Sequence, residues 1–533
     1  GWLGAGERQM QRGAKAASVL LAKTGGRARP ATISALHAEL TTWRRRAVAF
    51  WTSVAAVALA GVSLLLVPSV SLWSALALLS VVRVQALLAW LLCTAAEVFP
   101  VAPTSMLDAR RAMTWVGLWV ASFAVFVASC SAFSPEEGEG RPGLALFTPC
   151  KETRALDLTV RSVYCLHEPA LAQYIAAGAL ATVLVASHWR RRRYLLRFPA
   201  LQQQRWFRVK GGLCGVLRTT LALVFWSVVC FYGAYFLWGT WVSAWAASLT
   251  SALLQRPVYV FPSLWNDNSG YFPLASLFTT AGLVTTLSWY LASLLTHVIY
   301  TQRVSFDPEC EGKHRLLLEG LQESKDTYTK HLAFLDLWTV SEIDRERRLQ
   351  LFNDVGEEPA LPTALKACCA VLDRFTIDLQ AATLTEMERA EKKRNFVQRT
   401  KERLQRLLQP SKRPEAIFDR RQLVEWAALA LANLVAQSLV EDRYGLVQSN
   451  KSIPVALNSL VSCLVTVKQH EQAIAQGLTA RGLDSPPSRP AATAEALTTA
   501  VYRITATFHS YLAEYEFPEA LVPSLQAFVA FQI

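Results

Sequence analysis

The chain has 533 residues, of which 52% are hydrophobic and 18% are charged, and its formal net charge is +13. This composition is too apolar for an ordinary soluble protein and too charged for a protein that lies entirely inside a membrane. Long apolar runs fall within residues 47–298 and charged residues are dense in 303–422, so we predict one membrane domain and one soluble domain. Much of the basic excess lies beside apolar runs, where anionic lipid and topology signals explain it as well as nucleic-acid binding would. We therefore expect no direct nucleic-acid partner.

Six apolar segments are long enough to cross a bilayer, which takes roughly 20 predominantly apolar residues. They are residues 47–67, 70–96, 112–133, 170–188, 215–237 and 272–298. Residues 1–40 lack the short apolar core and cleavage site of a signal peptide, and residues 1–46 are predicted to be a cytosolic N-terminal segment. The predicted fold is all-α. A six-helix polytopic membrane domain over 47–299 is followed by a soluble cytosolic α-helical domain over 300–533.

Lys and Arg in the short loops predict the orientation of the spans. Basic residues precede the first and third segments and separate the fourth from the fifth: Arg44, Arg45, Arg46, Arg110, Arg111, Arg190 to Arg193, Arg197, Arg205, Arg208 and Lys210. The 134–169 loop has acidic residues among fewer bases, and the 238–271 loop has one basic residue, Arg256. We assign both loops to the lumenal side, and an even number of spans then leaves both termini cytosolic.

Two polar residues, Arg83 and Gln85, interrupt the second apolar segment. A charged residue near mid-membrane indicates a transport pathway or a partner. No other predicted span contains an acidic residue that could pair with Arg83. We therefore expect Arg83 to snorkel toward the surface or to face a neighbouring helix.

Two further segments have the pattern of a helix on a lipid surface. In the second lumenal loop Trp241, Trp245, Leu249 and Leu253 recur every four residues, as in a helix lying in the interface or a short helix packed on the spans. The segment 386–413 mixes basic and apolar residues and contains Lys392, Lys393 and Arg394. It is either a membrane-surface amphipathic helix or a solvated charged linker.

Ten cysteines are scattered along the chain without metal-ligand spacing. Cys150 and Cys165 share the large lumenal loop, where an oxidising compartment would allow a disulfide, with Cys130 as a competing partner. The others are expected to be reduced core residues. Phosphate-binding loops, catalytic triads and metal-binding clusters are not recognisable in the sequence, so we predict no catalytic residues, no cofactor and no metal.

Residues after about 314 repeat their apolar positions every three or four residues, which predicts helices. One such stripe comprises Ile453, Leu457, Leu460, Leu464 and Val467. The run Leu423 to Val440 is apolar enough for a seventh span, but Glu425, Asn433 and Gln437 form one polar stripe along it. A buried soluble helix tolerates that stripe better than lipid does, so we predict a core helix.

Three blocks of the soluble half carry a resemblance to a known family. The first is His331 to Leu337, with Phe334, Asp336 and the later Arg347-Arg348 and Leu351-Phe352 pairs. The second is Leu429 to Gln448, centred on Glu441-Asp442-Arg443-Tyr444-Gly445. The third is Ala496 to Phe508. Together these blocks resemble the transmembrane nucleoporins of the nuclear division cycle type, the Ndc family. The loop with Phe198-Pro199 is also similar. A long Ser- and Pro-rich stretch common in the family is reduced here to about 380–420.

This resemblance implies a structural, non-enzymatic protein at the nuclear pore membrane of the nuclear envelope. Its implied partners are the lipid bilayer and other nucleoporins, including the WD-repeat protein Aladin and membrane-binding inner-ring subunits, while self-association stays open. Supporting pore assembly and nucleocytoplasmic transport is the implied role. Partner-surface candidates are Phe334, Asp336, Leu337, Glu441, Asp442, Arg443 and Tyr444, for which local ion pairing and packing is the alternative. A transporter or channel is the competing reading of the whole chain.

Overall fold

A computed structural model describes most of the chain. The described residues are 33–66, 72–96, 109–133, 136–137, 141–142, 146–152, 161–199, 203–254, 258–260, 271–306, 314–322, 327–355, 359–391, 417–418, 420–449, 451–479, 488–519 and 522–530. They form two compact units. One is built from residues 40–302 without the segment 98–106, and the other from residues 33–39 and from 303 onward.

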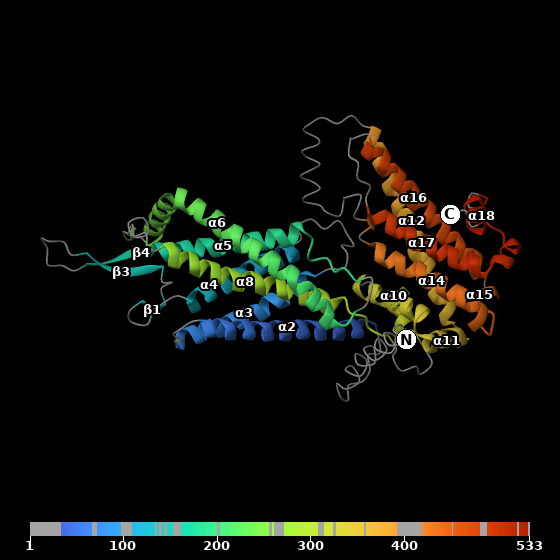
Figure 1. Cartoon of the computed structure of the whole chain (residues 1–533), viewed down its shortest axis with the longest axis horizontal. Helices are drawn as coiled ribbons and strands as arrows, with labels where there is room; N and C mark the ends of the chain where they lie inside the picture. Colours follow the sequence, from blue (N-terminus) through green and yellow to red (C-terminus); the bar gives the residue numbers. More distant parts are fainter. Residues whose placement is uncertain are drawn as a thin grey trace. The chain divides into compact units, whose positions relative to one another are not determined.

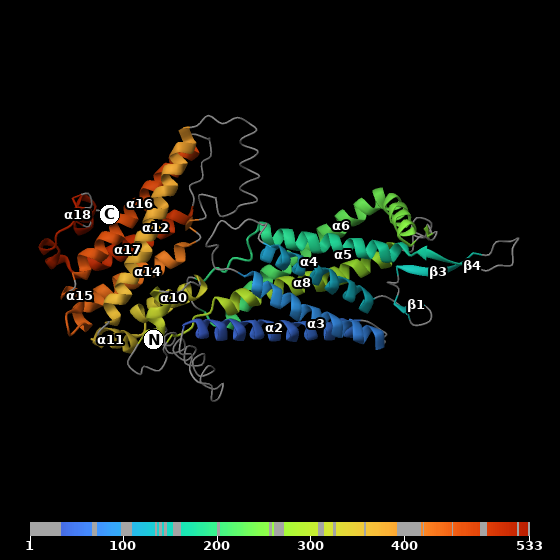
Figure 2. The same ribbon diagram turned by 180° about the vertical axis from the view of Figure 1, so that it is seen from behind.

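The first unit is a bundle of long apolar helices that run side by side (Figures 1 and 2). The helices are α2 (Ile33–Leu66), α3 (Leu72–Ala95), α4 (Ala109–Phe133), α5 (Glu168–Arg190), α6 (Arg205–Leu254) and α8 (Tyr271–Tyr300). The helix α4 lies among α3, α5 and α8, and α8 also packs on α6. Small side chains at the contacts, such as Ala121, Ala177 and Ala281, let the helices approach closely, as in membrane bundles.

All six predicted spanning segments fall on these helices. Four have the length and hydropathy of a membrane span: α4 over Ala112–Phe133, α5, α6 over Arg205–Leu253, and α8 over Leu274–Tyr300. In α3 the described apolar stretch, Leu79–Ala95, is shorter. The hairpin tip predicted at Val67 to Val70 lies outside the described residues.

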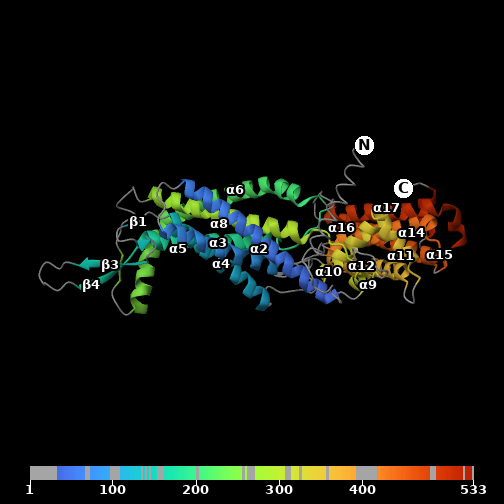
Figure 3. The ribbon, with the colours of Figure 1, turned by 90° about the horizontal axis from the view of Figure 1, so that it is seen from below.

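The helix α6 differs from the prediction. We expected a fifth span over 215–237 and a separate interfacial helix after it, but one helix of 50 residues covers both. At 1.5 Å per residue it is about 75 Å long, more than twice the roughly 30 Å thickness of a bilayer core. The helix is bent near its C-terminal end, so that its last turns point in a different direction from the rest (Figure 3).

The two loops predicted to be lumenal contain short strands that the all-α prediction missed. An antiparallel pair, β1 (Glu136–Glu137) and β2 (Arg141–Pro142), precedes a three-stranded sheet of order β3-β4-β5. The strand β4 (Arg161–Leu166) pairs antiparallel with β3 (Phe147–Glu152) and parallel with β5 (Val258–Val260). This sheet brings strands of the 134–169 and 238–271 loops together at one end of the bundle, while the lumenal assignment of both loops stays a prediction.

The second unit is helical over its described residues, in agreement with the prediction. Its elements are α9 (Arg315–Gln322), α10 (Thr327–Glu342), α11 (Arg345–Asn353), α12 (Ala360–Glu391), α14 (Arg421–Glu441), α15 (Leu446–Ser449), α16 (Ser452–Thr479), α17 (Ser488–Thr507), the 3₁₀ helix η3 (His509–Glu514) and α18 (Val522–Val529). The predicted stripe on α16, from Ile453 to Val467, is buried.

The helix α14 is long and apolar enough to cross a membrane by length and composition. In the structure it packs against α10, α12 and α17. Its polar residues Asn433 and Glu441 are buried and hydrogen-bonded inside this unit. These contacts are those of a core helix, although exclusion of a seventh span stays a prediction.

Candidate functional site

The segment that resembles the Ndc family is organised around the short helix α11. Asp344 begins this helix as its N-cap, and its carboxylate accepts a hydrogen bond from the backbone N–H of Arg347 at 3.3 Å. The cap fixes the first turn, from which Arg347 and Arg348 extend toward two different carboxylates. The helix α11 thereby links α10 to α14.

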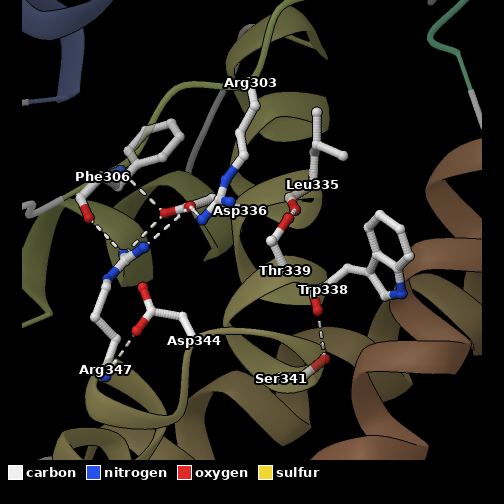
Figure 4. A network of polar contacts seen from close by, with 9 residues as sticks. All are labelled: Arg303, Phe306, Leu335, Asp336, Trp338, Thr339, Ser341, Asp344 and Arg347. Carbon is white, nitrogen blue, oxygen red and sulfur yellow. Dashed lines mark hydrogen bonds and ion pairs between the residues drawn. The ribbon is translucent and has the colours of Figure 1, made fainter. Parts of the chain in front are cut away.

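The first carboxylate is Asp336 on α10, which is fully buried (Figure 4). Arg347 donates to both of its oxygens, from Nη1 to Oδ1 at 3.1 Å and from Nη2 to Oδ2 at 2.9 Å. Arg303 adds a contact to Oδ1 at 3.3 Å, and the N–H of Phe306 donates to Oδ2 at 2.9 Å. Arg347 Nη2 also donates to the Phe306 carbonyl at 2.6 Å. The chain just after α8 is therefore fixed to α10 and α11.

The charge state of Asp336 follows from these contacts. Burial by itself raises the pKa of this carboxyl, but Arg347, Arg303 and the Phe306 N–H together hold it below its ordinary value. The acid is thus ionised at neutral pH. Nearby, His314 has a lowered pKa because burial and the positive charge of Arg347 disfavour its protonated form.

The second carboxylate is Glu441 at the end of α14. Arg348 donates to it from Nε at 2.7 Å and from Nη2 at 2.9 Å, and both side chains are buried. Nη1 of the same arginine donates to the Ser341 carbonyl at 3.0 Å. Arg345, which is mostly exposed, lies 3.5 Å from the Glu441 carboxylate. Both forked pairs use the planar geometry in which Arg matches a carboxylate.

The turn after α14 carries the other candidates of this block. Asp442 accepts from the N–H of Tyr444 at 3.2 Å and from that of Val447 at 2.9 Å, so its carboxylate organises the turn that leads into α15. Gly445 adopts φ +66°, a left-handed conformation that glycine tolerates best. The side chains of Arg443 and Tyr444 are exposed, Tyr444 to 60%.

Burial divides the predicted partner residues into two groups. Phe334, Asp336, Leu337 and Glu441 are buried, so in this conformation they stabilise the unit from inside and do not form a surface for a partner. Arg443 and Tyr444, with Asp442 beside them, are on the surface and stay predicted partner residues.

The third block forms part of the same core. Ala500, Val501, Ile504 and Phe508 are buried, and α17 packs against α14 and α16. The three blocks, distant in sequence, therefore meet through the α10–α11–α14 ion pairs and the α14–α17 contact.

Comparison with known proteins decides the family. The pattern of the family described as "Nucleoporin protein Ndc1-Nup" matches residues 41–422 and 407–526, which is most of the chain. The chain belongs to this family. The chain is 30% identical to the nucleoporin NDC1 of Danio rerio over 236 residues, and 28% identical to that of Mus musculus over 242 residues. These matches cover 43% and 44% of this chain but only 34% and 35% of those relatives.

Membership of the Ndc1-Nup family makes the chain a nucleoporin and a multi-pass membrane protein of the nuclear pore. The family is structural and is not known for enzymes. Among the described residues, no group of three or more His, Cys, Asp or Glu side chains could hold a metal ion.

In this nucleoporin the arginines of the predicted cytosolic loops converge on the last turn of α8. Arg44 on α2 donates to the carbonyls of Tyr300 and Gln302, the latter at 2.7 Å. Arg208 on α6 donates to the Val298 carbonyl at 3.2 Å. The last carbonyls of a helix lack partners within it and carry partial negative charge, so cations satisfy and stabilise them. Sequence reasoning used these arginines as a topology signal but did not find this role.

The structure describes one of the two segments that were predicted to lie on a lipid surface. Trp241 and Trp245 are each 62% exposed on α6, and Leu249 and Leu253 continue the same exposed face. Ser243 and Ala247 are buried, and α6 packs against β5 at this end. Lys392, Lys393 and Arg394 lie outside the described residues. Contact with lipid stays a prediction for both segments.

The disulfide also stays a prediction. Cys150 on β3 pairs in register with Val163, and Cys165 on β4 pairs with Thr148, which puts the two cysteines in diagonal positions on neighbouring strands. Diagonal Cα atoms are typically about 7–8 Å apart, which is longer than most disulfides span. The competing partner Cys130 has a free thiol that contacts the Gln173 side chain at 3.4 Å, so the structure does not support its pairing.

Proposed function

We propose that this chain anchors the nuclear pore complex in the pore membrane and uses its second unit to recruit soluble nucleoporins. In this member of a nucleoporin family, the exposed surfaces of the two units differ, and this difference is the observation that supports the proposal. The helix α6 exposes large apolar side chains along its length, such as Leu221, Phe225 and Trp226, each about three-fifths exposed. Lipid is the natural cover for such a face. The second unit buries most of its apolar residues, as a soluble domain does.

In the proposed topology, six helices of the unit over 40–302 cross the membrane and both termini are cytosolic. The arginines that meet at the end of α8 favour the cytosol for that end, because short loops rich in Lys and Arg stay on the cytosolic side. The β3-β4-β5 sheet would then be lumenal. The bent end of α6, with Trp241 and Trp245 exposed, would lie in the lumenal interface, since Trp favours that depth.

The partners we propose are nucleoporins of the inner ring that bind membranes, and Aladin. The docking surface would be the turn after α14, where Arg443 and Tyr444 are exposed while Glu441 and Asp442 hold the backbone. An exposed aromatic and an arginine are residues typical of interface hot spots. Basic residues 392–394 would add an electrostatic contact to anionic lipid.

Proximity labelling from a tag at residue 533 of the full chain, in intact cells, tests this function. We expect recovery of inner-ring nucleoporins and Aladin from the cytosolic side. Substitution of Arg443 and Tyr444 by Ala should lower Aladin recovery while leaving labelling of the pore membrane unchanged. Tyr511→Ala, which removes another half-exposed aromatic ring, is the matched control. Labelling of lumenal proteins, or of no pore component, would contradict the proposal.

A further inference from the structure

The helix α3 presents two opposite faces, and one of them is fixed by contacts inside the bundle. Val81, Gln85, Leu88 and Leu92 are buried, and α3 packs on α4 and α8. The amide of Gln85 donates a hydrogen bond to the Ser288 hydroxyl on α8. This buried polar contact determines which way α3 is rotated about its axis.

The opposite face is an exposed stripe formed by Leu79, Arg83, Leu87 and Trp90. Leu79 is 58% exposed, Leu87 50% and Trp90 46%, and Arg83 is also exposed. Spacings of four, four and three residues put all four side chains on one side of a helix. Arg83 thus lies in the middle of an otherwise apolar stripe.

The position of Arg83 along α3 makes its charge expensive in lipid. It is the twelfth residue of a 24-residue helix. At 1.5 Å per residue this is about 17 Å from the helix start, close to the middle of a hydrocarbon core roughly 30 Å thick. Arg keeps its charge in proteins, and such residues in spanning helices normally pair with another group.

The described residues of this chain do not supply that group. No hydrogen bond or ion pair of Arg83 is found in the part of the chain that the structure describes. None of the six predicted spanning segments contains Asp or Glu, so a second copy of the chain could not provide a carboxylate at this depth either. A carboxylate at the depth of Arg83 would therefore come from another protein.

We propose that the stripe Leu79–Arg83–Leu87–Trp90 binds a transmembrane helix of a different membrane protein, which carries an Asp or Glu at the depth of Arg83. The carboxylate would pair with the guanidinium, and the leucines and Trp90 would pack on apolar residues one turn to either side. The inference rests on the proposed role of α3 as a span. A lipid phosphate drawn toward Arg83 is the competing occupant.

Site-specific photocrosslinking in the full-length protein, in intact nuclear membranes, tests the proposal. A photoreactive residue replaces Leu79 or Leu87, and the crosslinked segment is identified by mass spectrometry. The same residue at Phe225 on α6, which also faces outward but has no charge beside it, is the control. Arg83→Leu and Arg83→Lys are introduced separately. Because no contact of Arg83 is found among the described residues, neither variant should disturb folding, and the Gln85–Ser288 contact remains.

The expected result is a crosslink from Leu79 and Leu87, but not from Phe225, to a spanning segment that contains an Asp or Glu. Arg83→Leu should lower the yield on the order of tenfold or more, since truncation of one partner in a desolvated charge pair is costly. Arg83→Lys should retain part of the crosslinking yield. Replacement of the partner carboxylate by its amide should reproduce the effect of Arg83→Leu.

Two results would overturn the inference. The first would leave the proposed topology intact, and the second would contradict it as well. Crosslinks to lipid alone, unchanged in Arg83→Leu, would show that α3 spans the membrane and that its exposed stripe faces lipid without a protein partner. Labelling of Leu87→Cys by a membrane-impermeant thiol reagent, without crosslinks to lipid or protein, would show that α3 does not span, and the proposed topology would fail with it.

Discussion

Buried or half-buried arginines stabilise both units, but the groups that they contact differ. In the first unit Arg44 and Arg208 donate to backbone carbonyls at the end of α8. In the second unit Arg347 and Arg348 form forked pairs with Asp336 and Glu441. Backbone carbonyls at a helix end are available only where a helix stops, whereas carboxylates can join helices anywhere along their length. The first arrangement therefore suits a membrane edge, and the second suits the interior of a soluble helical domain.

The largest loss of stability is expected in the second unit. Asp336→Ala would leave Arg347 buried without its carboxylate, and loss of one partner of a buried pair costs about 3–5 kcal/mol. Pulse proteolysis of the detergent-solubilised full chain, following fragments of the second unit, measures the loss. Arg315→Ala removes the exposed Arg315–Glu319 pair and should cost at most about 1 kcal/mol.

The double variant Asp336→Leu, Arg347→Met sharpens this prediction. Replacement of both partners by apolar residues removes the uncompensated charge, so much of the lost stability should return. If the double variant were as unstable as Asp336→Ala, the ion pair itself would not be the cause.

A smaller loss of stability is expected in the first unit. Arg44→Ala removes two hydrogen bonds from a charged donor to the end of α8, and each such bond contributes about 1.5–3 kcal/mol. We expect the thermal unfolding temperature of the solubilised protein to fall. Arg46→Ala, at an exposed position of the same basic run, is the control and should leave that temperature nearly unchanged. Equal effects of both changes would mean that net charge, and not the carbonyl contacts, stabilises this end.

A still smaller loss of stability is expected when Arg348 loses its forked hydrogen bonds to Glu441. Arg348→Lys keeps the charge near Glu441 but replaces the planar fork by a single ammonium, at an expected cost of about 1–2 kcal/mol. The matched change is Arg345→Lys, since Arg345 is mostly exposed and lies farther from the same carboxylate. Chemical denaturation of the two variants should separate them. Similar midpoints would contradict the assigned importance of the fork.

The smallest effect depends on pH. The pKa of His314 is below its ordinary value of 6.5 because burial and Arg347 oppose protonation, so the unfolded chain binds more protons than the folded chain below that pH. Stability of the second unit should therefore fall as the pH drops below about 6.5. The comparison of His314→Gln with the natural chain between pH 7.5 and 5 checks this, and the variant should show a shallower decline.

Much of the fold could be predicted from apolar length and periodicity. The six apolar segments lie on helices, and the α16 stripe is buried, because burial or lipid contact imposes a helical period on the sequence. The strands β1 to β5 were missed because they are short and lack alternation, as in β3 with Pro149. The continuous α6 was also missed, since the composition changes after residue 237 although the helix does not end there.

The candidate site was predicted less well. Resemblance found the segments around Asp336, Arg347 and Glu441, but it could not distinguish a buried ion pair from an exposed partner surface. Burial depends on which helices cover a residue, and no local pattern encodes that. The contacts of Arg44 and Arg208 with the end of α8 had no sequence signal beyond their charge.

Glycosylation mapping of the full chain in microsomes tests on which side of the membrane the β3-β4-β5 sheet and the basic loop lie. Acceptor sites are inserted in turn between β3 and β4, between β5 and α8, and in the basic loop between α5 and α6. We expect modification at the first two sites, which the β3-β4-β5 sheet brings to one end, and none at the third. Modification of the basic loop, or of only one of the first two sites, would contradict this expectation.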